Sequence, residues 1–243
     1  MVGEPSEIEK KLADKGKDLS FSEAAVRLDF WYMAITSMIV IGTSRLFDEN
    51  AETLGMHIES QEEMIQETYG VFEVIGAVVV GSLLTLFRSK LSPSSMVVLL
   101  TLLAGLGQLA MVWPSQVTST EPMRVAVSTA AFAEGGFLVA IASLCHEEYG
   151  TENFGILFGT MLSFGAVGLY GFDEIFFPNI FSWYATENAA GVHYFKSYGK
   201  WNEFLFTCLA GAYGVVFLLS IVSHISIRAI ERAKKDELVM VNF

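Results

Sequence analysis

The sequence predicts an all-α integral membrane protein, built as a bundle of six transmembrane helices. The chain of 243 residues is 52% hydrophobic and only 17% charged, and its mean hydropathy is +0.46. Soluble domains carry about 25% charged residues. A helix that crosses a bilayer needs about 20 largely apolar residues. Six segments meet that need: residues 28–48, 70–87, 95–113, 123–145, 153–177 and 204–227.

Residues 1–27 form a charged tail in front of the first span. Within it, Ser20-Phe21-Ser22-Glu23 has the spacing of a capping box, which predicts a short helix that begins near Ser20. The first residues lack the basic and short apolar regions of a signal peptide. We therefore expect targeting to come from the membrane helices themselves, or from a segment removed before residue 1.

The first three spans differ in their polar content. The first carries Arg45, which we expect near the far end of the bilayer, and a Glu-rich connector of residues 50–69 follows it. The second has Glu73 near its start, and the third contains no charged residue. An ionisable side chain at membrane depth is costly and usually faces other helices or a wet cavity, so the first two spans carry candidate functional groups.

The last three spans repeat this pattern. The fourth holds a lone Glu134 near its middle, and the fifth has Asp173 near its end. An aromatic connector leads to the sixth span, which contains no Asp, Glu, Lys or Arg. Residues 229–243 are expected to form a short C-terminal tail.

Small residues recur in the spans, and such residues let helices pack closely in lipid. We expect close helix contacts at Ala77 and Gly81, Gly105 and Gly107, Gly155 and Gly159, Gly165, Gly168 and Gly171, and Gly211 and Gly214.

The distribution of basic residues predicts the orientation. Six spans place both termini on one side, and most Lys and Arg residues lie in the two tails and in the loop after the second span. The positive-inside rule then places both termini in the cytosol or an equivalent compartment such as a matrix. Both a plasma membrane and an organelle membrane fit this pattern.

Composition also argues against several function classes. The net charge is -12, and no basic stripe exists that could neutralise phosphates, so nucleic-acid binding is not expected. Cys145 and Cys208 lie in or beside apolar segments and are expected to be buried thiols. The four His residues show neither metal-ligand spacing nor a nucleophile–base arrangement, so we expect no enzyme, metal or cofactor.

Three stretches resemble a known family. They are Leu19-Ser20-Phe21 through Asp29-Phe30-Trp31; Arg45-Leu46-Phe47 with Asn50 and Leu54-Gly55; and Glu148-Tyr149-Gly150 through Asn153-Phe154-Gly155, with Leu157 and Gly159. With them, residues 19–228 resemble the C-terminal six-helix half of a major facilitator superfamily transporter, in its nodulin-like and large-neutral-amino-acid-transporter branches. Such a half is built as a 3+3 repeat.

The resemblance implies which residues line a cavity. In each half of the superfamily the first, second, fourth and fifth helices approach the cavity, and the third and sixth lie outside. The candidate substrate- or ion-binding residues on or beside the lining helices are Glu134, Arg45, Glu73, Asp173 and Asn50.

Two of these candidates each have two interpretations. Glu134 is either a site for a substrate amine or a proton, or a structural acid packed beside Gly135 and Gly136. Arg45 either clamps a substrate carboxylate or pairs with acidic groups at the outer boundary, namely Asp48, Glu73 or Asp173.

Two functions remain open from the sequence. The first is a transporter half that moves an amino acid or small organic ion by alternating access, together with a second six-helix half or as a dimer. The second is a transport-inactive accessory or scaffold subunit within a larger membrane complex, for example one in a mitochondrion or another organelle. It is motivated by the presence of only six spans and by a partial loop signature, which keeps Gly81, Leu83 and Lys90 but has Thr85 for Asp and Arg88 for Gly.

Overall fold

A computed structural model describes residues 18–55, 61–87, 90–112, 121–187, 193–195 and 198–241. Its helices are α2 (Phe21–Ala25), α3 (Leu28–Glu49), α4 (Ala51–Gly55), α5 (Gln61–Leu86), α6 (Pro93–Val112), α7 (Glu121–Tyr149), α8 (Phe154–Tyr170), the π-helix η1 (Gly171–Phe176), α9 (Phe177–Tyr184) and α10 (Tyr198–Val241). Two short antiparallel strands, β1 (Ala185–Glu187) and β2 (His193–Phe195), pair with Ala185 opposite Phe195. The start of the N-terminal tail and Arg88 lie outside the described residues.

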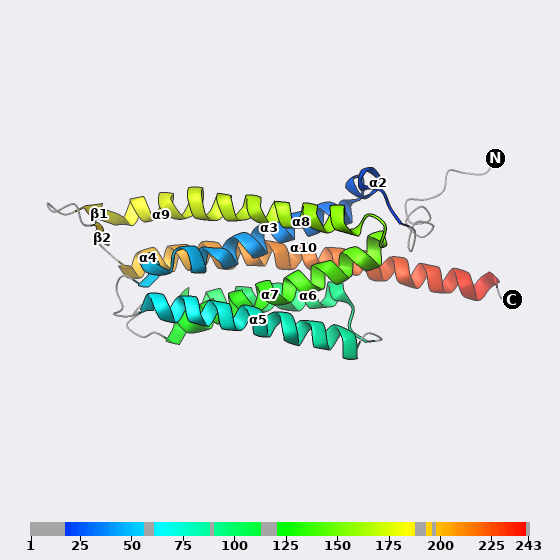
Figure 1. Ribbon diagram of the computed structural model, residues 1–243, viewed down its shortest axis with the longest axis horizontal. Coiled ribbons are helices and arrows are strands. Elements are labelled where there is room, and N and C mark those ends of the chain that lie inside the picture. Colours follow the sequence, from blue (N-terminus) through cyan, green and yellow to red (C-terminus); the bar gives the residue numbers. More distant parts are fainter. Residues whose placement is uncertain are drawn as a thin grey trace.

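Six of the described helical segments are long and apolar enough to cross a membrane, which confirms the predicted helical membrane class. They are Leu28–Glu49, Glu63–Leu86, Pro93–Val112, Glu121–Tyr149, Phe154–Tyr184 and Glu203–Ala229. Figure 1 shows them running side by side, with α2 and the C-terminal end of α10 at the same end of the bundle.

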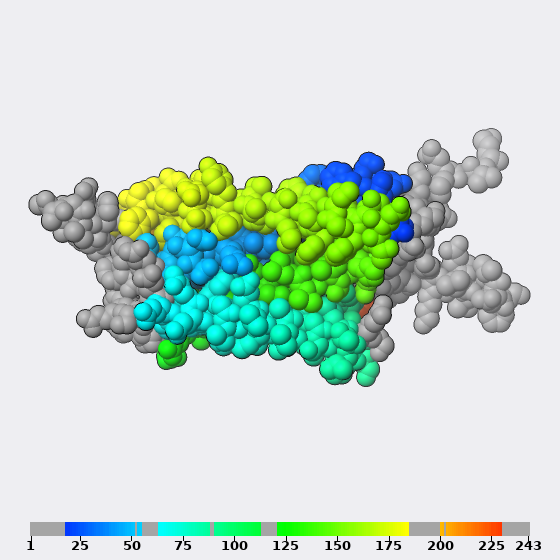
Figure 2. Space-filling model, in the orientation of Figure 1, coloured from blue at the N-terminus to red at the C-terminus, as the bar shows by residue number. Residues whose placement is uncertain are grey.

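The helices pack in pairs. α3 packs mainly on α8, and α5 mainly on α7. α6 and α10 pack against each other and lie behind these pairs (Figure 1). The space-filling view, from the same direction, shows the near side of the bundle, where α8, α3, α7 and α5 reach the surface (Figure 2).

The predicted capping box is present at the start of α2. The backbone N–H of Ser20 donates to Glu23 Oε2 at 2.8 Å, and the Glu23 N–H donates to Ser20 Oγ at 3.4 Å. These reciprocal bonds satisfy two N–H groups that would otherwise lack partners at a helix start.

Glycines lie at the crossings of the α3–α8 pair and the α5–α7 pair. A Cβ added to Gly168 on α8 would overlap the backbone of Met38 on α3, and Gly42 on α3 meets the backbone of Gly168. A Cβ added to Gly135 on α7 would overlap the carbonyl oxygen of Glu73 on α5, and one on Gly76 that of Phe132. Backbone contact of this kind lets helices approach closely without a hydrophobic driving force.

The small-residue prediction was right at some positions and wrong at others. Gly105, Gly107, Gly165 and Gly168 do lie against a neighbouring helix, whereas Gly81 makes only an ordinary contact with Val139. The prediction was wrong at five glycines, where a Cβ would meet nothing within 4 Å: Gly155, Gly159, Gly171, Gly211 and Gly214. Sequence spacing alone does not indicate which face of a helix meets a partner.

Several helices extend beyond the expected spans. α5 begins at Gln61, inside the segment expected to be a connector, because Ile65 and Tyr69 lie one turn apart and are buried in the core. The expected C-terminal tail is helical as far as Val241, in a segment rich in helix-forming Ala, Glu, Lys and Arg. The fifth segment continues through η1 and α9 to Tyr184.

Candidate functional site

The side chain of Arg45 on α3 forms hydrogen bonds with residues on α5 and α7. Its Nε donates to Glu134 Oε1 on α7 at 2.9 Å, and its Nη2 donates to Glu73 Oε1 on α5 at 2.9 Å. Its Nη1 also lies 3.8 Å from Asp48 Oδ2, one turn further along α3. Hydrogen bonds between ionised partners are among the strong ones in proteins. We name Arg45, Glu73, Glu134 and Tyr69 the ion network.

Tyr69 completes the ion network from the helix that also carries Glu73. Its hydroxyl donates to Glu134 Oε2, so each oxygen of the Glu134 carboxylate has a donor. The guanidinium carbon of Arg45 lies 5.6 Å from the centre of the Tyr69 ring, within the range of a cation–π interaction. Tyr69 is buried and contacts both Arg45 and Glu134, and it therefore helps to hold these two side chains in position.

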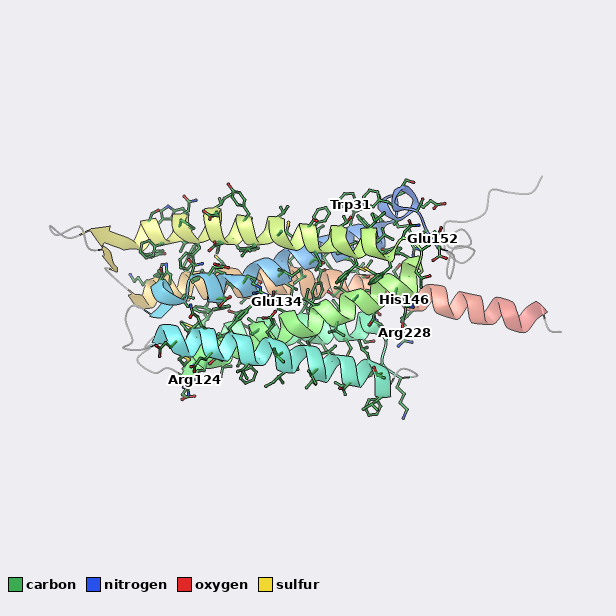
Figure 3. All side chains as sticks on the ribbon, in the orientation of Figure 1. Trp31, Arg124, Glu134, His146, Glu152 and Arg228 are labelled. Carbon is green, nitrogen blue, oxygen red and sulfur yellow. The ribbon has the colours of Figure 1, made fainter. Side chains whose placement is uncertain are left out.

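The members of the ion network differ in how far they are enclosed. The Glu134 side chain is 1% exposed, while those of Arg45 and Glu73 are 32% and 25% exposed. Figure 3 places Glu134 near the middle of the bundle, between α3 and α5. The network therefore runs from a buried carboxylate to a guanidinium and a second carboxylate that reach the surface where α3 meets α5.

A layer of polar groups accompanies the network through the core. Ser44 Oγ lies 2.9 Å from the hydroxyl of Tyr213 on α10 and donates to the Ala130 carbonyl at 3.2 Å. The buried apolar side chains fall into two clusters. Ala130 belongs to one cluster and Ala133 to the other, so Glu134 lies close to the boundary between them.

Asp173 and Asn50 form a second polar contact. Asn50 Nδ2 donates to Asp173 Oδ1 at 2.6 Å and joins the end of α3 to η1. η1 is a short π-helix, and short π-helical distortions are often found at functional sites. The sequence offered Asp173 as a possible partner of Arg45; in the structure Arg45 instead bonds Glu134 and Glu73, while Asp173 accepts from Asn50.

Two features of these sites were missed from the sequence. Tyr69 was assigned to a connector, although its position four residues before Glu73 places both on one helix face. The second is an ionic cluster at the end of the bundle near α2. There Arg27 Nη2 lies 3.2 Å from Asp29 Oδ2 and 3.5 Å from Glu148 Oε2, and its guanidinium lies over the Tyr149 ring.

Asp18 fastens the chain before α2 to the loop between α7 and α8. Its Oδ1 accepts from the backbone N–H of Thr151 at 2.6 Å and of Glu152 at 2.9 Å. Gly150 has φ 83°, a left-handed conformation that suits glycine, and a Cβ there would collide with Asp18. The N–H groups of Glu152 and Thr151 hold the pKa of the Asp18 carboxyl below its ordinary value of 3.8.

Replacing Asp18 by alanine is expected to release this contact and to speed hydrogen exchange at the Thr151 and Glu152 amides at neutral pH. Because the folded pKa is lowered, the stabilisation is complete above the ordinary pKa of 3.8 and is lost as the pH falls through the lower folded value. Hydrogen-exchange mass spectrometry checks both effects. Asp18→Asn, which keeps the acceptor oxygen, serves as the matched control. Equal protection in wild type and Asp18→Ala would contradict the contact.

The described cavities lie away from the ion network. A cavity of about 20 Å³ lies between α3, α6, α7 and α10, with Thr36, Ser94 and Ser220 among its lining residues. A hollow of about 370 Å³ opens among Leu84, Pro93, His146 and their neighbours. Cys145 is buried and Cys208 half-buried, and both are free thiols. Within the described ranges, no three His, Cys, Asp or Glu side chains are grouped to hold a metal ion.

No protein-family model matches the chain, and no curated protein matches it.

Proposed function

We propose that the chain is one six-helix half of a major-facilitator-type membrane transporter, which moves an amino acid or a small organic ion by alternating access. The observation that carries this proposal is the ion network, which joins α3, α5 and α7 through Arg45, Glu73 and Glu134. These helices are the first, second and fourth spans, the positions that line the cavity in that superfamily. Ionisable residues inside a membrane often mark substrate and ion pathways.

The pairing of helices supports the same proposal. In a 3+3 repeat the first span corresponds to the fourth and the second to the fifth, so the α3–α8 pair corresponds to the α5–α7 pair. α8 is the main partner of α3 and α7 the main partner of α5, and glycines lie at the crossing in both pairs. The glycines at corresponding positions of the two repeats are also similarly spaced. The separation between Gly42 and Gly135 differs by one residue from the separation between Gly76 and Gly168. Repeats of three spans run in opposite directions across the membrane, as in transporter halves.

The proposed roles follow from the bonds within the network. Glu134 is the group that takes up a proton, because it is the most deeply enclosed carboxylate and is held by Arg45 and Tyr69. A proton on Glu134 neutralises one of the two carboxylates that hold Arg45. The Nε of Arg45 can then donate to a substrate carboxylate, while Nη2 stays bonded to Glu73. Asn50 and Asp173 join α3 to the fifth span.

Uptake into proteoliposomes tests the proposal. The chain, reconstituted with any second half that co-purifies, is expected to accumulate at least one of a set of radiolabelled amino acids. Glu134→Gln should lower the rate by at least about tenfold, because a charged hydrogen bond is replaced by a neutral one. Glu121→Gln is the matched control, since Glu121 lies on the same helix but is 75% exposed at its start. Absence of uptake, or equal rates for both variants, would sink the proposal.

One observation favours the alternative, a transport-inactive accessory subunit of a larger membrane complex. In the superfamily's loop signature an Asp stands where this chain has Thr85. The Thr85 hydroxyl donates to the Gly81 carbonyl of its own helix at 2.8 Å. Mass analysis on native gels separates the two functions. A large complex that lacks any second transporter half would favour the subunit, and a discrete pair of halves would favour the transporter.

A further inference from the structure

A small cavity lies inside the bundle where α3, α6, α7 and α10 meet, away from the ion network. Its volume is about 20 Å³. A single water molecule requires about 10 to 15 Å³, so the cavity has room for one water and little more. Most of its wall is apolar, but four residues with hydroxyl groups and an exposed fraction between 3% and 7% also line it: Thr36, Ser94, Ser220 and Ser223.

Ser220 is the lining residue that points to an occupant. Its Oγ is buried and has no hydrogen-bond partner among the residues that the structure describes. Other buried hydroxyls donate to a carbonyl one turn earlier on their own helix: Ser37 Oγ donates to Met33 at 2.9 Å, and Thr101 Oγ1 donates to Val97 at 3.0 Å. Buried polar groups are nearly always bonded to protein or to ordered water, because an unpaired one is costly. The Ser220 hydroxyl therefore requires a partner inside the cavity.

Other parts of the wall supply the further bonds that a water needs. Thr36 on α3 donates its proton to the Tyr32 carbonyl at 2.7 Å, so its oxygen keeps lone pairs that can accept. Ser94 Oγ on α6 lies 3.0 Å from His224 Nδ1, and this oxygen can accept as well. A water that accepts from Ser220 and donates to Thr36 and Ser94 makes three hydrogen bonds, the usual number for a buried water.

The chemistry of the wall argues against other small occupants. An apolar group, such as the end of a lipid chain, would leave the Ser220 hydroxyl unpaired. A cation would need a compensating negative charge, and within the described ranges the lining residues include no Asp or Glu. The occupant that fits is small and uncharged, and it both donates and accepts hydrogen bonds. Water has these properties.

We propose that this cavity is a binding site for one ordered water molecule, which joins Ser220 on α10 to Ser94 on α6 and to Thr36 on α3. The site is separate from the ion network and does not depend on the proposed transport. α6 and α10 pack against each other and contribute no residue to the network. The water bonds this pair of helices to α3, the helix that carries Arg45.

X-ray radiolysis of the full-length chain in lipid nanodiscs tests the proposal, because radicals formed from a bound water oxidise the side chains that touch it. Met33 and Phe137 line the cavity, whereas Met96 and Phe206 do not. The two Met side chains are each 5% exposed, and the two Phe side chains are each 0% exposed. We expect Met33 to be oxidised at least about fivefold faster than Met96, and Phe137 faster than Phe206 by a similar factor.

Alanine variants show whether the Ser220 hydroxyl holds the water. Ser220→Ala should lower the oxidation rate of Met33 by about fivefold, because the water loses one of its three hydrogen bonds. Ser37→Ala is the matched control, since Ser37 is 1% exposed and bonds to its own helix but does not line the cavity. It should leave the rate at Met33 unchanged. The comparison of Met33 with Met96 in wild type tests the proposal even if Ser220→Ala fails to fold.

Three results would overturn the proposal. The first is equal oxidation of Met33 and Met96 in wild type. The second comes from mixing with water of heavy oxygen just before the pulse: a held water leaves ordinary oxygen on Met33, and immediate labelling with heavy oxygen would mean free exchange with solvent. The third comes from replacing Na⁺ in the buffer by choline, which should change nothing. A changed rate at Met33 would indicate a bound cation in place of water.

Discussion

Replacing Arg45 by alanine is expected to lower the free energy of unfolding of the bundle by about 3 to 5 kcal/mol. The guanidinium holds Glu134 and Glu73 with hydrogen bonds of 2.9 Å each, and the Glu134 side chain is 1% exposed. Without Arg45, the buried carboxylate keeps only the Tyr69 hydroxyl as a partner. An unpaired charge inside the membrane costs far more than the loss of a surface ion pair.

Reversible unfolding in bicelles measures this change. The double variant Arg45→Ala, Glu134→Gln should recover much of the loss, because it removes the unpaired charge along with its partner. Arg45→Lys should recover only part, since an ammonium group cannot reach two carboxylates with the geometry of a planar guanidinium. Arg124→Ala is the control: its side chain is 53% exposed and lies 3.9 Å from Glu121, so about 0 to 1 kcal/mol is expected. Equal losses for Arg45→Ala and Arg124→Ala would contradict the importance of the network.

The fold class could be predicted because it depends on composition and segment length. Six apolar segments and the capping box at Ser20 are local features, and the structure has both. Helix ends were predicted less accurately, because buried residues such as Ile65 and Tyr69 extend a helix beyond its apolar segment. This is why α5 begins at Gln61 and not near residue 70.

The ion network could be predicted only in part. Arg45, Glu73 and Glu134 stand out in the sequence because each is an ionisable residue in an apolar segment. Their contact depends on helix crossings, and those are set by glycines such as Gly135 whose partners lie on another helix. The sequence placed Arg45 near the far end of the first span and Glu134 near the middle of the fourth. The long Arg45 side chain bridges that difference in depth.

Gly135, the residue after Glu134, affects both the packing of α7 on α5 and the ion network. Changing Gly135 to alanine is expected to destabilise the bundle by about 1 to 3 kcal/mol and to disturb the ion network as well. The new methyl group would overlap the carbonyl oxygen of Glu73, and a backbone atom cannot rotate away as a side chain can. α5 must therefore move away from α7, and it carries Glu73 and Tyr69 with it. The hydrogen bonds that these residues make with Arg45 and Glu134 would lengthen.

Gly159→Ala on α8 provides the comparison for this prediction. A Cβ at Gly159 meets nothing within 4 Å, so the change should be neutral or should stabilise the helix by up to about 1 kcal/mol. Unfolding in bicelles measures both variants, and the uptake assay reports whether the network is disturbed. Because the two substitutions are chemically identical, any difference between them measures the contact of α7 with the Glu73 backbone. Equal stability of the two variants would mean that α5 and α7 do not cross at Gly135, and the position of Glu73 beside Arg45 would lose its support.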